Sequence, residues 1–144
     1  MVSKKKIIKN EDFKICNNCN PNRYLKFNFT YCSQVGEPAK EDSYSLLNRL
    51  IFLSSDLYKM MLYKYQGNKK TFIEDISIDK ININVPKKFR DENPVQTNEK
   101  INIFRIYPAG RPNGSANPRV IGMIRNTIFY VFYIDWKGIM YNHN

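Results

Sequence analysis

An alternating pattern of apolar and polar residues marks the first element of the chain. In residues 24–31 every second side chain is apolar or aromatic, and Lys26, Asn28 and Thr30 lie between them. A period of two residues is typical of a strand with one buried face. The expected buried face consists of Leu25, Phe27, Phe29 and Tyr31. The sequence therefore predicts a strand over residues 24–31.

Helical spacing follows this strand. In residues 43–65 apolar side chains recur at intervals of three and four, and Asp42 or Ser43 can cap the first turn. The polar segment 54–56 interrupts the apolar stripe. The pattern fits one long helix or two shorter helices that meet near Ser55, and we favour two.

The middle of the chain gives weaker signals. Residues 72–81 fit a short helix or a strand equally well. Residues 86–94 are polar and have a proline at each end, which is typical of a loop.

The last third of the chain predicts an antiparallel sheet. Alternation returns over residues 100–107, and a loop rich in Gly and Pro follows at 108–118. All seven residues of 128–134 are apolar or aromatic, as in a central strand covered on both faces. The other expected elements are a strand over 119–125, a tight turn at Asn126 and Thr127, a hairpin turn over 135–138 and a last strand over 139–141.

Together these elements predict an α+β fold. An N-terminal strand and two helices precede a curved antiparallel sheet of three to four strands, with the helices against one face. Residues 1–22 are rich in Lys and Asn and are expected to be a flexible basic arm. Residues 23–144 are expected to form a single domain.

The charge of the chain points to a polyanionic partner. The 144 residues include 23 Lys and Arg but only 13 Asp and Glu, for a net charge of +10. Lys4, Lys5, Lys6 and Lys9 account for four of these charges, so we expect the rest to be spread through the folded part. Nucleic acid or the ribosome is the typical partner of such a chain. An acidic protein is the rival partner, and a charge that serves only solubility is the third interpretation.

Other sequence features limit the location and the cofactors. No apolar run reaches the roughly 18 residues of a membrane span, and the basic N-terminus lacks the apolar core of a secretory signal. We therefore expect a cytoplasmic protein without a membrane partner. Three cysteines, an odd number, argue against a disulfide framework. Cys16 and Cys19 have the spacing of half a zinc site that Cys32 and His143 would complete, but the second pair lacks such spacing. No metal or other cofactor is therefore expected.

The order of the elements resembles the RelE/ParE-like superfamily of small bacterial toxins. The resemblance covers residues 24–141 and depends most on the closing segment RVIGMI-RNT-IFYVFYID-WKG-IMY. The chain is also similar to a group of bacterial proteins of unassigned role with a YLxFxF start and an FYVxWxD…LY ending. Here these motifs are Tyr24–Phe29, Phe129–Asp135 and Met140–Tyr141. That group has His after the aromatic strand, where this chain has Lys137 and Gly138.

The toxin resemblance implies a metal-independent endoribonuclease that acts on mRNA, possibly at the ribosome, in a toxin–antitoxin or phage-defence setting. Such enzymes promote attack of a 2′-hydroxyl on the adjacent phosphate. The reaction needs cations to stabilise the charged phosphorane and groups that move protons. The candidate catalytic residues are Arg119, Tyr141, Arg125 and His143. An acidic antitoxin is a further partner that the resemblance implies.

Other side chains are candidates for contact with nucleic acid. Arg105 lies on the strand expected over residues 100–107, and Lys137 lies in the hairpin turn expected over 135–138. Arg111 lies in a glycine-containing loop that superficially resembles a phosphate loop. Tyr130 and Tyr133 are suited to stack on bases, unless they point into the core, as their apolar strand favours. His143 has the alternative interpretation of a frayed tail.

Two other functions fit the same residues. In the first, the chain is a non-catalytic protein of defence or counter-defence that binds nucleic acid or an acidic protein. In the second, it is a structural partner in a larger assembly. An exposed apolar patch would indicate the last of these.

Overall fold

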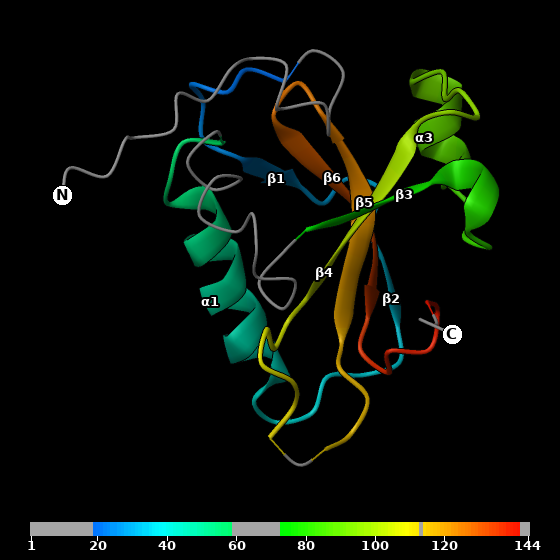
Figure 1. Cartoon of the computed structure of the whole chain (residues 1–144). Helices are drawn as coiled ribbons and strands as arrows, with labels where there is room; N and C mark the ends of the chain where they lie inside the picture. The colour runs from blue at the N-terminus through cyan, green and yellow to red at the C-terminus, as the bar shows by residue number, and fades with distance from the viewer. Residues whose placement is uncertain (1–18, 59–72, 113, 142–144) are drawn as a thin grey trace, which may run out of the picture.

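The computed structural model describes residues 19–58, 73–112 and 114–141, and these residues form an α+β fold around one mixed sheet (Figure 1). The elements in chain order are β1 (Lys26–Asn28), β2 (Ser33–Val35), α1 (Asp42–Ser54), β3 (Glu74–Ser77), the 3₁₀ helix η2 (Ile78–Lys80), α3 (Lys87–Glu92), β4 (Lys100–Arg105), β5 (Arg119–Arg125) and β6 (Ile128–Asp135). The predicted α+β class is therefore confirmed.

The sheet has six strands and is not purely antiparallel. Its order is β1-β6-β5-β4-β3, and β2 also pairs with β6. Both β1 and β2 run parallel to β6, β1 along its first half and β2 along its second. The remaining pairs are antiparallel. The prediction of three to four antiparallel strands is therefore confirmed only in part: β3, β4, β5 and β6 are antiparallel neighbours, but the N-terminal segment adds β1 and β2 to the same sheet on the outer side of β6.

The first predicted strand is interrupted. Residues 29–32 form a turn in which the Cys32 amide donates to the Phe29 carbonyl, and Phe29 is 45% exposed. The Asn28 side chain stabilises this turn by accepting from the Thr30 amide at 2.9 Å. Short polar side chains favour such turns, which compete with a continuous strand. The alternation over residues 24–31 therefore describes β1 correctly but not the chain beyond Asn28.

Helix α1 agrees with the expected first helix. It ends at Ser54, where the hydroxyls of Ser54 and Ser55 turn back to helix carbonyls. The polar segment 54–56 thus ends the helix, as its pattern indicated. The second expected helix falls largely on residues 59–72, which lie outside the described residues.

Three other segments complete the comparison with the sequence. Residues 72–81, left open between helix and strand, contain β3 and η2. Residues 86–94, expected to be a loop, contain α3, which Pro86 precedes and which Phe89 anchors with a fully buried ring. Residues 139–141, expected to be a strand, follow a turn and make no strand pairing. The short helix was missed because most of its residues are charged. In place of the expected strand pairing, the Met140 amide donates a hydrogen bond to the Asp135 carboxylate.

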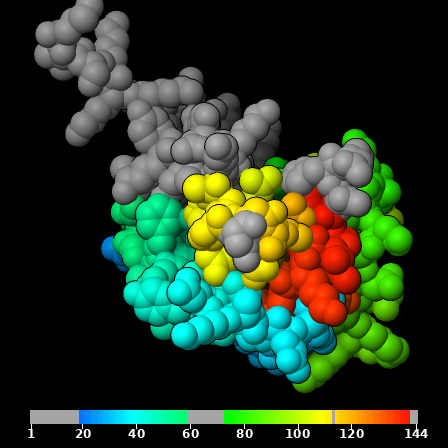
Figure 2. All heavy atoms as spheres, turned by 90° about the horizontal axis from the view of Figure 1, so that it is seen from below, coloured from blue at the N-terminus to red at the C-terminus, as the bar shows by residue number. Residues whose placement is uncertain are grey.

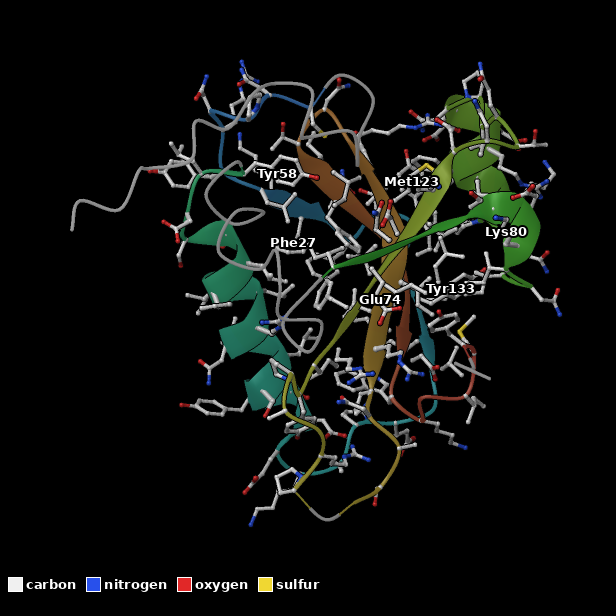
Figure 3. The ribbon with its side chains drawn as sticks, in the orientation of Figure 1. Phe27, Tyr58, Glu74, Lys80, Met123 and Tyr133 are labelled. Carbon is white, nitrogen blue, oxygen red and sulfur yellow. The ribbon has the colours of Figure 1, made fainter. Side chains whose placement is uncertain are left out.

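The sheet separates two apolar cores. Leu46 and Leu53 of α1 pack on one face against Phe104, Val120 and Phe129. Phe89 of α3 packs on the other face against a second set, which consists of Ile83, Val85, Ile101, Ile103, Ile121, Met123 and Phe132. In Figure 3 the labelled Phe27 and Tyr58 belong to the α1 side, and Met123 and Tyr133 belong to the α3 side. The prediction that residues 128–134 form an inner strand covered on both faces is confirmed.

The β5–β6 hairpin contains the tight turn that the sequence predicts. Asn126 and Thr127 both have positive φ, 52° and 63°, as in the hairpin turns that match strand twist. A bulge follows in β6, because Ile121 pairs with Tyr133 whereas Gly122 pairs with Val131. Phe132 is the extra residue, and it enters the core on the α3 side.

The positive charge is not spread evenly. The described residues include 14 Lys and Arg and 11 Asp and Glu, for a net charge of +3. Most of the chain's charge of +10 therefore belongs to residues 1–18 and 59–72. Within the described residues the positive excess is therefore small, and whether the rest is spread through the fold falls on residues outside the described ranges.

The cysteines also differ from expectation. Cys19 is disulfide-bonded, whereas Cys32 is a free thiol. Burial raises the pKa of the Cys32 thiol. Among the helices that the structure describes, none is long and apolar enough to cross a membrane.

Candidate functional site

Two arginines lie side by side at one end of the sheet. Arg105 ends β4 and Arg119 begins β5, and the two are direct partners in the antiparallel register. Side chains of such partners share a face, with Cβ atoms about 5 Å apart. Like charges in this arrangement destabilise a sheet unless other groups offset them. Both side chains are partly exposed.

The arginine pair lies on the α3 face of the sheet. Side chains two residues apart in a strand share a face. Arg105 follows the buried Ile103 by two residues, and Arg119 precedes the buried Ile121 by two. The apolar core on this side therefore ends where the two guanidinium groups begin.

Two carboxylates flank the arginine pair. Asp135 is the register partner of Arg119 on β6, and it is completely buried. Glu74 begins β3 opposite Ile103 and is partly exposed; Figure 3 labels its side chain. The pKa of Arg119 reflects both groups: burial and the charge of Arg105 lower it, whereas Glu74 and Asp135 oppose this effect. The two arginines at this end of the sheet therefore lie between a carboxylate on β6 and a carboxylate on β3.

Tyr141 lies over Arg119. The Arg119 Nη1 donates to the Tyr141 carbonyl at 2.7 Å, and the guanidinium carbon lies 5.5 Å from the centre of the phenol ring. The Tyr141 hydroxyl reaches Glu74 Oε2 at 3.5 Å, which is a weak hydrogen bond. Burial and the charge of Glu74 raise the pKa of Tyr141 above 10.0. Tyr141 is therefore a neutral proton donor at physiological pH.

The turn after β6 positions Tyr141. The Asp135 Oδ2 accepts from the Met140 amide at 2.8 Å, and the Gly138 amide donates to the Asp135 carbonyl. Gly138 has a positive φ of 64°, and a Cβ there would lie 2.5 Å from the Asn117 carbonyl oxygen. The chain therefore returns over the end of the sheet. Figure 2 shows this segment in red beside the yellow loop that joins β4 to β5.

The arrangement can bind an anion at the two partly exposed arginines and can transfer a proton. Guanidinium groups provide planar, charge-assisted donors for phosphate oxygens. Glu74 can accept a proton, and the Tyr141 phenol can donate one. Three residues that the sequence singled out, Arg105, Arg119 and Tyr141, therefore lie together.

Arg125 lies elsewhere. It ends β5, whereas Arg119 begins it, so about 20 Å of extended chain separates them. The Arg125 guanidinium is bound by Glu99 at 2.7 Å and by the Pro94 carbonyl at 2.9 Å. The structure therefore does not bring Arg125 to the same site as Arg119.

Arg111 and Lys137 are also separate from the arginine pair. Arg111 forms an ion pair with the buried Asp42 at the start of α1, and so fastens the β4–β5 loop to the helix. Lys137 is exposed, and the carbons of its side chain lie against Gly36.

The two tyrosines of β6 are partly exposed and pack against the core on the α3 side. The Tyr130 ring lies 5.3 Å from that of Phe89, and the Tyr133 hydroxyl donates to the Asn84 carbonyl. Both rings therefore face the core, as the alternative interpretation had it, but both side chains are partly exposed. His143 lies outside the described residues, as does Cys16 of the suggested zinc site.

Sequence reasoning missed Glu74 and Asp135. Glu74 lies in the segment whose secondary structure was open, so its face was unknown. Asp135 was interpreted as a turn residue, although a charged residue directly after seven apolar ones was a signal of its own. The described residues contain no group of three or more His, Cys, Asp or Glu placed to hold a metal ion.

Comparison of the chain with protein-family models, with curated proteins and with solved structures found no match.

Proposed function

We propose that the chain is a toxin-like, metal-independent endoribonuclease whose site is the Arg105–Arg119 pair with Tyr141 and Glu74. The observation that carries this proposal is the juxtaposition of two partly exposed guanidinium groups without a salt bridge of their own among the described residues. Two adjacent positive side chains destabilise a sheet when no ligand is bound, whereas both can stabilise a bound phosphate. The resemblance to RelE/ParE-like toxins in element order supports the same function.

Each side chain has one role in the proposed reaction. Arg105 and Arg119 hold the scissile phosphate and stabilise the charge that develops on the phosphorane. Glu74 accepts the proton of the 2′-hydroxyl as its oxygen attacks phosphorus. Tyr141 donates a proton to the departing 5′-oxygen. The products are a 2′,3′-cyclic phosphate and a free 5′-hydroxyl.

Mapping of RNA 5′ ends tests this proposal. The purified chain is incubated with a translating extract and, in a parallel reaction, with free RNA in excess EDTA. We expect new 5′-hydroxyl ends in both. Arg105→Ala should reduce cleavage about 100-fold or more, as loss of one oxyanion donor does. Arg23→Ala removes an exposed arginine at the opposite end of β6 and should leave cleavage unchanged. RNA without new ends under both conditions would contradict the proposal.

A second candidate function is binding of RNA without cleavage. This function is favoured because the Arg119 guanidinium already donates a hydrogen bond to the Tyr141 carbonyl. Part of its hydrogen-bonding capacity is therefore used within the fold. This function predicts salt-sensitive binding that Arg105→Ala weakens, with no cleavage product from either variant. The two candidates therefore differ in the end-mapping experiment and agree in a binding experiment.

A further inference from the structure

The exposed face of α1 carries no charge. Both charged residues of the helix, Asp42 and Arg49, are buried. The exposed positions are Ser43, Tyr44, Leu47, Asn48, Ile51 and Phe52. Helix faces that meet water normally carry charged side chains, whereas the centres of protein interfaces are poor in charge and rich in aromatic residues. This face, at the left flank of the molecule in Figure 1, therefore has the composition of an interface.

Large apolar side chains are concentrated on the same face. Four of the seven exposed large hydrophobic residues in the described ranges belong to α1: Tyr44 (70% exposed), Leu47 (55%), Ile51 (54%) and Phe52 (47%). Single apolar residues are normal on a surface, whereas a contiguous group marks a contact with another molecule. Their spacing of three and four residues places them on one stripe of the helix.

A groove of about 460 Å³ lies beside the stripe. Phe52 of α1 lines one side, and Ile106, Tyr107 and Pro108 of the segment after β4 line the other. Tyr44, in the first turn of the helix, is the most exposed of the apolar residues of α1. The face thus has a projecting ring near one end and a hollow toward the other.

These features are arranged evenly about the middle of α1. Asn48 is the central residue of the helix, with Tyr44 four residues before it and Phe52 four residues after it. In an antiparallel pair of α1 helices that meet at Asn48, Tyr44 of each copy faces Phe52 and the groove of the other. The two Asn48 amides meet at the two-fold axis, where each can donate and accept a hydrogen bond.

The charges beyond the ends of α1 fit the same arrangement. Lys40 lies eight residues before Asn48, and Asp56 lies eight residues after it. The antiparallel pair therefore brings Lys40 of each copy toward Asp56 of the other. A strongly charged partner, by contrast, gains no ion pair on the uncharged exposed face of the helix. The surface is thus complementary to itself.

We propose that α1 joins two copies of the chain in a two-fold dimer, with the two helices antiparallel and in contact at Asn48. The dimer does not depend on ribonuclease activity, because α1 covers one face of the sheet and the Arg105–Arg119 pair lies on the other. Each copy keeps its arginine pair on the side remote from the contact.

Sedimentation equilibrium of the nuclease-treated full chain tests the dimer. A contact between two short helices is smaller than a typical stable interface, so we expect a dissociation constant of about 10 µM. Each copy has a net charge of +10, and screening of their repulsion should tighten the dimer as salt rises from about 0.05 to about 0.5 M. Copies held together by residual RNA would instead separate in high salt.

Tyr44→Asp should raise the dissociation constant at least about tenfold, because it removes the projecting ring and places a charge in the contact. An acidic residue in the first turn suits a helix, so the fold should persist. Ser43→Asp is the matched control. It adds the same charge at the neighbouring exposed position, which points away from the stripe, and should leave the dissociation constant unchanged. Circular dichroism verifies the fold of both variants.

Cysteine cross-linking tests the antiparallel arrangement. In a Cys32→Ser background, which removes the free thiol, Asn48→Cys should form a disulfide-linked dimer under mild oxidation. A residue at the two-fold axis meets its own copy at the short distance that a disulfide requires. Ser43→Cys in the same background should not be linked.

Four outcomes would overturn the proposal. The chain stays monomeric at about 300 µM, or high salt separates the two copies. Tyr44→Asp and Ser43→Asp dimerise equally well, or Ser43→Cys is linked as readily as Asn48→Cys.

Discussion

At the scale of single residues, Asp42 connects the helix to the sheet. Its side chain accepts from the Ala39 amide at 2.8 Å and from the Tyr107 hydroxyl at 2.7 Å, and it pairs with Arg111. Burial alone would raise the pKa of Asp42, but the hydrogen bonds from Arg111, Tyr107 and Ala39 together lower it below 3.8. One buried carboxylate thus holds the start of α1 and the β4–β5 loop together.

This arrangement predicts an acid-dependent stability. A carboxyl group with a lowered folded-state pKa contributes its full stabilisation above its unfolded pKa of 3.8 and loses it as the pH falls through the lower folded value. Asp42→Asn should reduce the free energy of unfolding by about 2 kcal/mol at pH 7 and by less at pH 3. Urea unfolding at both pH values measures this difference.

Asp79→Asn is the control for the loss of a carboxylate. Asp79 is exposed in η2, so its substitution should change the free energy of unfolding by less than about 0.5 kcal/mol at either pH. Equal losses at pH 7 and pH 3 for Asp42→Asn would show that packing, and not charge, explains the effect of Asp42.

At the scale of elements, the bulge in β6 depends on Gly122. A Cβ on this residue would lie 2.0 Å from the Tyr130 carbonyl oxygen, and the neighbouring strand cannot move away without losing its pairing. Gly122→Ala should therefore lower the free energy of unfolding by about 3 kcal/mol. Gly114→Ala has open space around it and only the cost of a positive φ, so it should lose about 1 kcal/mol. Thermal unfolding of both variants tests the difference, and equal losses would argue against a steric role of Gly122.

The turn after β6 allows a second prediction at this scale. Asp135 accepts from the Met140 amide, and an asparagine in its place would still offer a carbonyl oxygen. Asp135→Ala should therefore speed hydrogen exchange of the Met140 amide about tenfold or more, whereas Asp135→Asn should speed it less. The comparison by NMR separates the loss of the acceptor from the loss of the charge. Unchanged exchange in the alanine variant would show that this contact does not hold the turn.

The elements differ in how far the sequence predicts them. The strand over 119–125 and the apolar run of β6 were correct because their patterns extend over seven or eight residues. Helix α3 was missed because six residues with one buried side chain, Phe89, carry no periodicity. The parallel pairing of β1 and β2 with β6 was missed because strand partners that are distant in sequence leave no local signal.

The candidate site shows the same limit. Arg119 and Tyr141 were chosen from a resemblance at the ends of the closing strands, and the turn at Asp135 brings them together. Arg125 was chosen on the same ground but lies at the other end of β5. Glu74 reaches the site only through the pairing of β3 with β4, which the sequence did not show. The sequence indicated which residue types could form the site. Which residues lie next to one another could be known only from the order of the strands in the sheet.

At the scale of the whole molecule, the described fold is nearly balanced in charge. Because the net charge of the described residues is only +3, a general attraction to RNA, if the proposed function holds, would depend mainly on residues outside the described ranges. Within the fold, Arg111 and Arg125 are engaged by Asp42 and Glu99. A localised phosphate contact is therefore expected at the Arg105–Arg119 pair and not over the surface in general.

The salt dependence of RNA binding separates localised from general contact. Each phosphate contact with single-stranded nucleic acid contributes a slope of about −0.7 to the plot of log affinity against log salt. With a 2′-O-methyl RNA, which cannot react, Arg105→Ala should weaken binding and make the slope about 0.7 less steep. Arg23→Ala should change neither value, because its exposed side chain lies at the opposite end of β6. Fluorescence anisotropy at several salt concentrations gives both slopes. Equal changes in the two variants would mean that RNA contacts are spread over the molecule and that the arginine pair is not a binding site of its own.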